Sequence, residues 1–307
     1  MPLLSLIIPC YNASTFLDEL LASIWAQDYP AVEVIAVDDG SQDDTLARLR
    51  AWQARAPRPM QVLTGPNQGA SAARNRGLHA AQGDLVQFMD ADDLLLPGKL
   101  SRQVAALAHS GADWVASDYE VRDTSLAQLL DLVALPRLVD QPLETAITRI
   151  IITGNPLYRR EAVLAIGGYD EALPSSQDWD FHLRLVLADR PVHYVSGPGF
   201  VHRIVAGSIS HNWVKTSRTA CQVVDKLKSQ LALHPGLTQA ARLHLANLFY
   251  NTAIQTFDAA QISHYLSQCR YWSQGQPFFS SPIKRRLHRL LGLTTVLRLD
   301  QRRLRFA

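Results

Sequence analysis

Short apolar runs and helical spacings alternate along the first 120 residues of the chain. The apolar runs have the length of strands, and between them apolar residues recur three and four positions apart, which predicts amphipathic helices. The expected strands cover residues 3–8, 32–37, 60–63, 85–89 and 114–117, and the expected helices cover 14–27, 43–54, 69–81 and 97–109. Repeated strand–helix alternation predicts an α/β fold with a Rossmann-like, mostly parallel sheet and helices on both faces.

The pattern loosens after residue 118. Residues 126–135 have the spacing of an amphipathic helix within an insertion, and 193–195 and 199–204 are expected to be two strands that flank Gly197-Pro198. From residue 212 onward the spacing is helical, as in 240–257 and 262–272. We therefore expect a core domain over 1–210, with sub-regions 1–118 and 119–210, and a helical C-terminal region over 211–307.

Charge is distributed unevenly along the chain. The net charge is +2, but residues 284–307 carry eight Lys or Arg and one Asp, a charge of +7, which leaves −5 for the remainder. A basic tail on an acidic core argues against nucleic acid as a partner. The mixture of basic and apolar residues in the tail predicts a basic amphipathic helix that binds a membrane surface. The alternative is a basic face packed on the other C-terminal helices.

The chain shows no pattern of disulfides, secretion or membrane spanning. Its three cysteines, Cys10, Cys221 and Cys269, are widely spaced and fit a reducing compartment. The N-terminus lacks the features of a signal peptide, and no apolar stretch reaches 18 residues. We therefore expect a cytoplasmic protein, either free or peripheral on the inner face of the cell membrane.

An acidic cluster, Asp90-Ala91-Asp92-Asp93, directly follows the apolar run Leu85–Met89. A buried strand of this kind ends at the sheet edge where ligands bind in α/β domains. Like charges repel there unless a cation lies among them, and carboxylates together with substrate phosphates suit Mg²⁺ or Mn²⁺. The alternative is a solvated loop in which an aspartate caps the next helix.

Two further blocks should meet this edge. Tyr11 and Asp39 follow the first and second strands, and a ring and a carboxylate together predict a nucleobase pocket. The alternative is a turn or helix cap formed by Asp39, with Tyr11 at the edge of the core. The helix expected from Gly69 begins with small residues, and Arg74 within it could reach a phosphate or form a structural ion pair.

Several blocks in order resemble the family-2 glycosyltransferases over roughly residues 3–210. They are Ile7-Ile8-Pro9-Cys10-Tyr11-Asn12, Val37-Asp38-Asp39-Gly40-Ser41, Asn67-Gln68-Gly69, Ala73-Arg74-Asn75 and Phe88-Met89-Asp90-Ala91-Asp92-Asp93. The resemblance implies a GT-A fold, with nucleotide binding in 1–118 and acceptor binding in 119–210. It also implies donor-binding roles for the residues Pro9, Tyr11, Asn12, Asp39, Arg74, Asp90 and Ala91. Asp92 would be the main ligand of a Mn²⁺ or Mg²⁺ ion.

The second half carries the rest of the resemblance. Gln177-Asp178-Trp179-Asp180 corresponds to a family block that usually begins Glu-Asp, and its Asp is the catalytic base, here Asp178. Gln177 departs from the pattern and carries no charge. A structural alternative is that Ser175 and Asp178 form a capping box. The residues expected near the acceptor or diphosphate are Gly168, Gln177, Trp179 and Arg203, with His202 as a further metal ligand before the loop 206–210. The alternatives are a core position for Trp179 and a structural role for His202.

These features together predict a metal-dependent inverting glycosyltransferase. It would move a sugar from a nucleotide-sugar, with UDP the expected nucleotide, to a hydroxyl of a saccharide or lipid-linked acceptor in cell-surface polysaccharide or glycolipid synthesis. One alternative is a catalytically inactive nucleotide-sugar-binding scaffold. A sugar nucleotidyltransferase would carry a Gly-rich basic loop after the first strand, where Pro9-Cys10-Tyr11-Asn12 stands instead.

Overall fold

The computed structural model describes residues 1–205, 213–256, 258–276, 278–279, 281, 284, 288 and 292–305. The chain divides into two compact units. Unit 1 comprises Met1–Ala146 and Ile150–Ser208, and unit 2 comprises Ile147–Arg149 and Ile209–Ala307. The loop 206–210, which the sequence placed after His202 and Arg203, lies outside the described residues.

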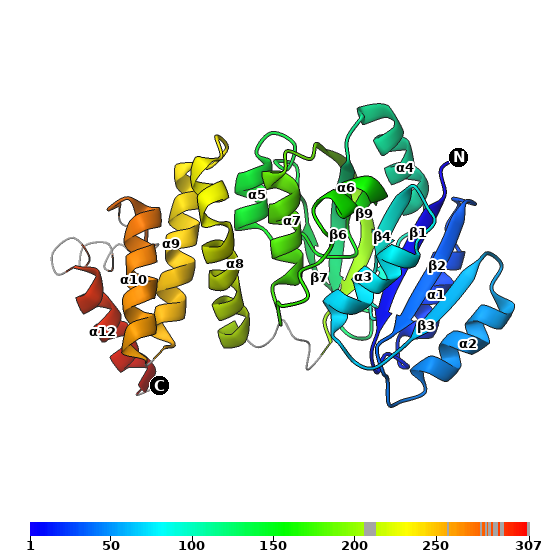
Figure 1. The fold of residues 1–307 in the computed structure, drawn as a ribbon, viewed down its shortest axis with the longest axis horizontal. Coiled ribbons are helices and arrows are strands. Elements are labelled where there is room, and N and C mark those ends of the chain that lie inside the picture. Colours follow the sequence, from blue (N-terminus) through cyan, green and yellow to red (C-terminus); the bar gives the residue numbers. More distant parts are fainter. Residues whose placement is uncertain are drawn as a thin grey trace. The chain divides into compact units, whose positions relative to one another are not determined.

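Unit 1 is built on a sheet in the order β3-β2-β1-β4-β8-β6-β9-β5, with β7 beside β6 (Figure 1). The strands are β1 Leu4–Cys10, β2 Val32–Asp38, β3 Met60–Thr64, β4 Leu85–Phe88, β5 Leu94–Leu95, β6 Trp114–Arg122, β7 Leu129–Val133, β8 Leu157–Arg159 and β9 Val192–Arg203. Strands β3, β2, β1 and β4 pair in parallel, as do β6 and β9. The prediction of a mostly parallel α/β sheet is therefore confirmed.

Helices cover both faces of this sheet. They are α1 Leu17–Trp25, α2 Thr45–Arg55, α3 Ala70–Ala80, α4 Lys99–Ser110, α5 Pro142–Thr148, α6 Arg160–Ala165 and α7 Gln177–Leu187. Leu4, Leu6 and Ile8 of β1 pack in one core cluster with apolar residues of α1 and α4. Helix α3 contacts β1 and β2 (Figure 1), and a Cβ on its Gly77 would lie 2.4 Å from Ile7, so the alternate residues of β1 serve the opposite face.

Strands β7, β8 and β9 differ from the sequence predictions. The helix expected over 126–135 is wrong, because Leu129–Val133 forms strand β7, antiparallel to β6. The two strands expected around Gly197-Pro198 are one strand, β9, which tolerates them through a shift of register opposite Ser117–Tyr119. Strand β8 was not predicted, and it enters antiparallel between β4 and β6. In each case hydrogen bonding to a partner strand sets the conformation of the segment, and the local sequence pattern does not reveal that partner.

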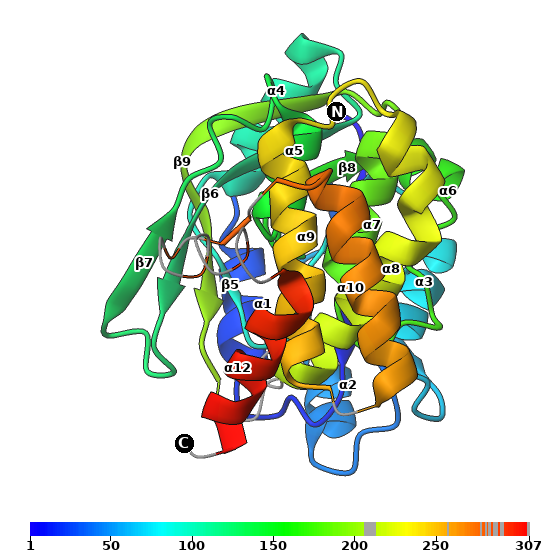
Figure 2. The same ribbon diagram turned by 90° about the vertical axis from the view of Figure 1, so that its left-hand side faces the viewer.

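Unit 2 is helical in its described part, with α8 Trp213–Leu233, α9 Gln239–Ile254, α10 Ala259–Ser273 and α12 Leu293–Arg305. Helix α9 is contacted by α8, α10 and α12 (Figure 2). The apolar residues Leu293, Val296 and Leu297 of α12 are buried, and Asp300 pairs with Lys284 Nζ at 2.6 Å. This burial favours the alternative in which the tail packs on the other C-terminal helices over the one in which its apolar face enters a membrane. Residues 282–283, 285–287, 289–291 and 306–307 of the tail lie outside the described residues.

None of the described helices has both the length and the apolar character needed to cross a bilayer.

Candidate active site

The loops after β1 and β2 are fastened to each other at the carboxyl edge of the sheet. Ser41 Oγ accepts from the backbone N–H of Asn12 at 3.0 Å, and Asn12 Oδ1 accepts from the backbone N–H of Gln42 at 2.8 Å. Pro9 lies in β1 beneath this loop, opposite Val37. Tyr11 is 50% exposed at this edge. Asn12 therefore fixes the loop that carries Tyr11. Its partner Ser41 was not expected from the sequence to have a functional role.

Asp39 joins the loop after β2 to the start of α3. Its two carboxylate oxygens accept from the backbone N–H groups of Gln68 and Gly69, both at 2.8 Å, and the residue is buried. The sequence left two roles open for Asp39, contact with a nucleobase and closure of a turn. These hydrogen bonds are those of the turn. Asp39 thus shapes the wall of the expected nucleobase pocket.

The acidic cluster lies just beyond β4. Ala91 packs against the apolar core, and Asp93 is buried and accepts from the backbone N–H of Arg203 at 2.9 Å. Burial, and then the charges of Asp93 and Asp90, raise the pKa of Asp92 to about 7. Asp90 pairs with Arg74 and Asp93 with His202, and the remaining crowding of negative charge around Asp92 is the condition that a bound cation would relieve.

The residues of this cluster fit a divalent cation whose ligands come partly from the protein and partly from a bound substrate. No group of three or more His, Cys, Asp or Glu side chains arranged for a metal occurs among the described residues. Asp92 would therefore need oxygens from a bound diphosphate to complete a Mg²⁺ or Mn²⁺ site. His202 Nδ1 lies 3.2 Å from Asp93 Oδ1, an arrangement that orients many metal-binding histidines. Although burial opposes it, the bond and charge of Asp93 raise the pKa of His202 to about 9.

Arg203, which the sequence places near the acceptor or diphosphate, ties three segments of the chain together. Its guanidinium donates to the backbone oxygens of Asp92 at 2.8 Å and Thr124 at 3.0 Å, and to the carboxylate of Glu19. The residue is 4% exposed and its guanidinium covers the ring of Phe16 at 4.5 Å. With these partners Arg203 secures the acidic turn and is not presented to a ligand.

Arg74 connects the acidic cluster to the helix that carries the expected base. Its Nη2 pairs with Asp90 Oδ1 at 2.6 Å, and its Nη1 donates to Gln177 Oε1 at 3.1 Å. The guanidinium also lies 4.9 Å from the centre of the Tyr169 ring. The structural ion pair, one of the two alternatives from the sequence, is therefore formed. The uncharged Gln177 accepts from Arg74 without adding a negative charge beside Asp178.

Asn75 and Gly168 lock the turn before Tyr169 against α3. Asn75 Oδ1 accepts from the backbone N–H of Tyr169 at 2.8 Å, and Asn75 Nδ2 donates to the Tyr169 carbonyl at 2.9 Å. Gly168 has a φ of +68°, and a Cβ there would lie 2.5 Å from Asn75 Oδ1. Gly168 is thus required by packing, and the expected acceptor contact is replaced by a structural role.

Asp178 lies in the first turn of α7 and is held by Thr153. Its Oδ1 accepts from Thr153 Oγ1 at 2.5 Å and its Oδ2 from the Thr153 backbone N–H at 3.2 Å. Both oxygens therefore bond Thr153, which is not the pattern of a capping box. Burial raises the pKa of Asp178, and the positive charge of Arg74 opposes this rise.

Trp179 takes the core position, one of the two alternatives from the sequence. Its indole Nε1 donates to the Ala146 carbonyl at 2.7 Å, and the residue is 8% exposed, so it belongs to the core rather than to an acceptor surface.

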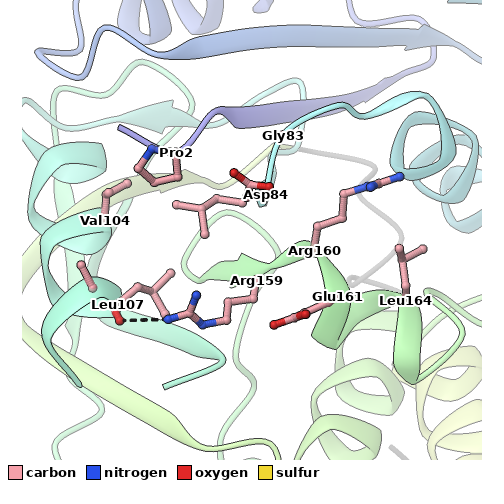
Figure 3. A pocket seen from close by; sticks show the side chains of 11 residues that line it. Pro2, Gly83, Asp84, Val104, Leu107, Arg159, Arg160, Glu161 and Leu164 are labelled. Carbon is pink, nitrogen blue, oxygen red and sulfur yellow. Dashed lines mark hydrogen bonds between the residues drawn. The ribbon is translucent and has the colours of Figure 1, made fainter. Parts of the chain in front are cut away.

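A cavity of about 440 Å³ lies at the opposite edge of the sheet, where β1 and β4 begin (Figure 3). Pro2, Asp84, Arg159 and Glu161 are among its lining residues. Arg159 Nη2 donates to the Leu107 carbonyl at 3.3 Å across one wall. None of the predicted site residues lines this cavity, so it is separate from the candidate site.

The sequence is similar to known glycosyltransferases. It matches the family described as glycosyl transferase family 2 over residues 5–167. A Haemophilus influenzae protein named an uncharacterized glycosyltransferase is 40% identical over 34% of this chain and 42% of its own length. EpsH of Bacillus subtilis is 29% identical over 70% of this chain and 64% of its own length. The GalNAc(5)-diNAcBac-PP-undecaprenol beta-1,3-glucosyltransferase of Campylobacter jejuni is 39% identical over 33% of each chain. The chain thus spans 33% to 64% of the length of these relatives.

Solved structures share the fold at low identity. The structure of S. aureus TarS 1-349 in complex with UDP-GlcNAc has a TM-score of 0.68 and 18% identity, covering 99% of this chain and 91% of that chain. The mannosyltransferase PcManGT from Pyrobaculum calidifontis, in complex with GDP-Man and Mn²⁺, has a TM-score of 0.60 and 18% identity, covering 98% and 87%. The predicted GT-A fold is confirmed. Because the family match spans more than half of the sequence, this chain belongs to glycosyl transferase family 2.

Proposed function

We propose that the protein is an inverting glycosyltransferase that uses a nucleotide-sugar donor. The observation that carries the proposal is the buried carboxylate of Asp178. Two hydrogen bonds hold it, and Arg74 links the start of its helix to the acidic cluster. Asp178 is held at the ligand-binding edge of the sheet and feels the positive charge of Arg74, and a carboxylate in such a place suits a general base.

The proposed reaction is a single displacement. Asp178 accepts the proton of an acceptor hydroxyl while that oxygen attacks the anomeric carbon, and the bond from that carbon to the diphosphate oxygen breaks on the opposite side. Attack opposite the leaving group inverts the anomeric configuration. Tyr11 stacks on the nucleobase at the sheet edge. A divalent cation at Asp92 would offset the negative charge of the leaving diphosphate, and His202 would serve as a further ligand after losing one ring proton.

We infer a UDP-sugar donor and a saccharide or lipid-linked acceptor. The TarS structure of the same fold was solved with UDP-GlcNAc, and the Campylobacter relative is named for glucosyl transfer to an undecaprenol-linked saccharide. The complex of PcManGT with GDP-Man and Mn²⁺ supports a divalent cation and makes GDP the next nucleotide to test.

One set of measurements tests the proposal. Wild type, Asp178→Asn, Asp92→Ala and the exposed control Asp140→Asn are titrated with UDP by calorimetry with and without Mn²⁺, and turnover is assayed with UDP-sugars and a panel of acceptors. We expect Asp178→Asn to bind UDP normally but to turn over about 10²–10⁴-fold more slowly, the usual loss for a general base. Asp92→Ala should lose the Mn²⁺-dependent part of UDP binding.

Two results would count against the proposal. Near-normal turnover by Asp178→Asn would reject this residue as the base. Binding of UDP without turnover by the wild type, over the whole acceptor panel, would favour an inactive nucleotide-sugar-binding scaffold.

A further inference from the structure

Thr153, which hydrogen-bonds the Asp178 carboxylate, lies in a turn whose sequence shows no recognisable motif. Thr153 is fully buried and donates to both oxygens of the Asp178 carboxylate, through its hydroxyl at 2.5 Å and its backbone N–H at 3.2 Å. A carboxylate bonded at both oxygens cannot rotate about its terminal bond without losing one of the two partners. The direction in which Asp178 presents its lone pairs is therefore set by Thr153.

The turn that carries Thr153 is fixed independently of the Thr153 side chain. Gln87 Nε2 donates to the Gly154 carbonyl at 3.2 Å, and Gln103 Nε2 donates to the Asn155 carbonyl at 3.0 Å. Both glutamines are buried, one on β4 and the other on α4. A Cβ on Gly154 would lie 2.8 Å from the ring of Phe200, so the turn also fits closely against β9.

A buried lysine sets the orientation of both glutamines. Lys99 Nζ donates to Gln87 Oε1 at 2.5 Å and to Gln103 Oε1 at 2.6 Å, and Lys99 has no exposed surface. Because the lysine occupies both amide oxygens, the amide N–H groups are left to face the turn. Burial lowers the pKa of Lys99 well below its usual value. In its charged or neutral form, the amine of Lys99 can donate to both amides.

We propose that Thr153 is a positioning residue for the base Asp178, and that its hydroxyl keeps the Asp178 carboxylate ionised and aimed at the acceptor. The proposal rests on the proposed function. Hydrogen bonds donated to a carboxylate favour its charged form, which opposes the effect of burial. The turn supplies the geometry and the hydroxyl supplies the stronger of the two contacts, since it is the shorter one.

Other charged and titratable groups also surround Asp178. Arg74 favours its ionised form, whereas Asp90 disfavours it. The phenols of Tyr158 and Tyr169 are near enough to be influenced by its charge, and burial raises the pKa of both, so they stay neutral. His182 Nδ1 contacts the backbone oxygen of Asp178 at 2.7 Å and leaves the carboxylate free for Thr153.

Removal of the hydroxyl alone gives a sharp test. In Thr153→Val the backbone N–H and the two glutamine contacts to the turn remain, while the hydroxyl loses its bond to the Asp178 carboxylate and its contact with the Tyr169 phenol. We expect the acidic limb of the pH profile of kcat to move up by about one pH unit, because the carboxylate loses a donor to its charged form. Activity should fall most at low pH and recover toward the alkaline plateau, and UDP binding should not change.

The controls separate positioning from a merely structural role. Thr153→Ser restores a hydroxyl at the same place and should return the acidic limb toward that of wild type. Thr252→Val removes another buried threonine hydroxyl, which donates to Leu248 within α9, and should leave the profile unchanged. If Thr153→Val does not fold, Thr153→Ala carries the same expectation.

Two outcomes would overturn the inference. One is a wild-type pH profile in Thr153→Val. The other is a loss of rate that is equal at every pH and that Thr153→Ser does not repair. Asp178→Asn is measured in parallel. Normal turnover in that variant would reject Asp178 as the base. If Asp178→Asn is inactive but Thr153→Val has the pH profile of the wild type, only the role of Thr153 is rejected.

Discussion

Two arginine–aspartate pairs in unit 1 have the same length but very different surroundings. Arg74 Nη2 lies 2.6 Å from Asp90 Oδ1, with side chains 6% and 33% exposed. Arg48 Nη1 lies 2.6 Å from Asp18 Oδ2, with side chains 45% and 49% exposed. Replacement of each arginine by methionine keeps much of the apolar stem and removes the charge. We predict that Arg74→Met destabilises unit 1 far more than Arg48→Met.

The expected difference follows from burial. Loss of one partner of a buried ion pair costs about 3–5 kcal/mol, and the partial exposure of Asp90 reduces this to about 2 kcal/mol. The contact of Arg74 with the Tyr169 ring contributes about 1 kcal/mol more. An exposed pair such as Arg48–Asp18 contributes about 0–1 kcal/mol. Arg74→Met should therefore cost about 3 kcal/mol of unfolding free energy.

The measurement is urea denaturation of both variants and the wild type, with fluorescence detection at fixed pH and salt. A second series at high salt should reduce the effect of Arg48→Met and leave most of the effect of Arg74→Met, because buried pairs are screened less. If the two variants differ by less than about 1 kcal/mol in unfolding free energy, burial does not set the contribution of Arg74 and the reasoning is wrong.

Two further predictions concern the residues around the base. Gly168→Ala should destabilise the protein by about 2 kcal/mol more than Gly167→Ala in urea denaturation, because both glycines have positive φ but only Gly168 would place a Cβ against Asn75; equal losses would contradict this. Burial lowers the pKa of His182 to about 3, from 6.5, so the unfolded state binds the proton more tightly and stability falls as pH drops below about 6.5. Between pH 7 and pH 5 the wild type should lose about 2 kcal/mol more than His182→Asn, and parallel curves would reject the neutral buried histidine.

The first half of the fold could be predicted from the sequence, since its signals are local. The runs that form β1, β2 and β4 are apolar and short, and α1 and α4 have apolar residues at helical spacing. Strand β7 could not be predicted, because Leu129–Val133 takes its conformation from pairing with β6 while its leucines stay about half exposed. Strand β8 has only three residues, too few for any periodicity.

The sequence by itself determined the family, the order of the motifs and their common location. Parallel strands carry their carboxyl ends to one edge, so Tyr11, Asp39 and Asp90 had to meet there once the strands were recognised. It also predicted Asp178 as the base, through the resemblance of its block to a family motif.

Only the tertiary structure decided what each side chain contacts. Arg74 reaches Gln177 across 103 positions of the chain, and Arg203 reaches the Asp92 carbonyl across 111. Asp178 meets Thr153 across 25 positions. Hydrogen bonds and charge pairs act over a few ångströms, and the distance between remote residues is set by packing rather than by spacing in the sequence. For this reason motif order predicted where the candidate site lies, whereas the contacts of Arg74, Arg203 and Thr153 became visible only in the folded chain.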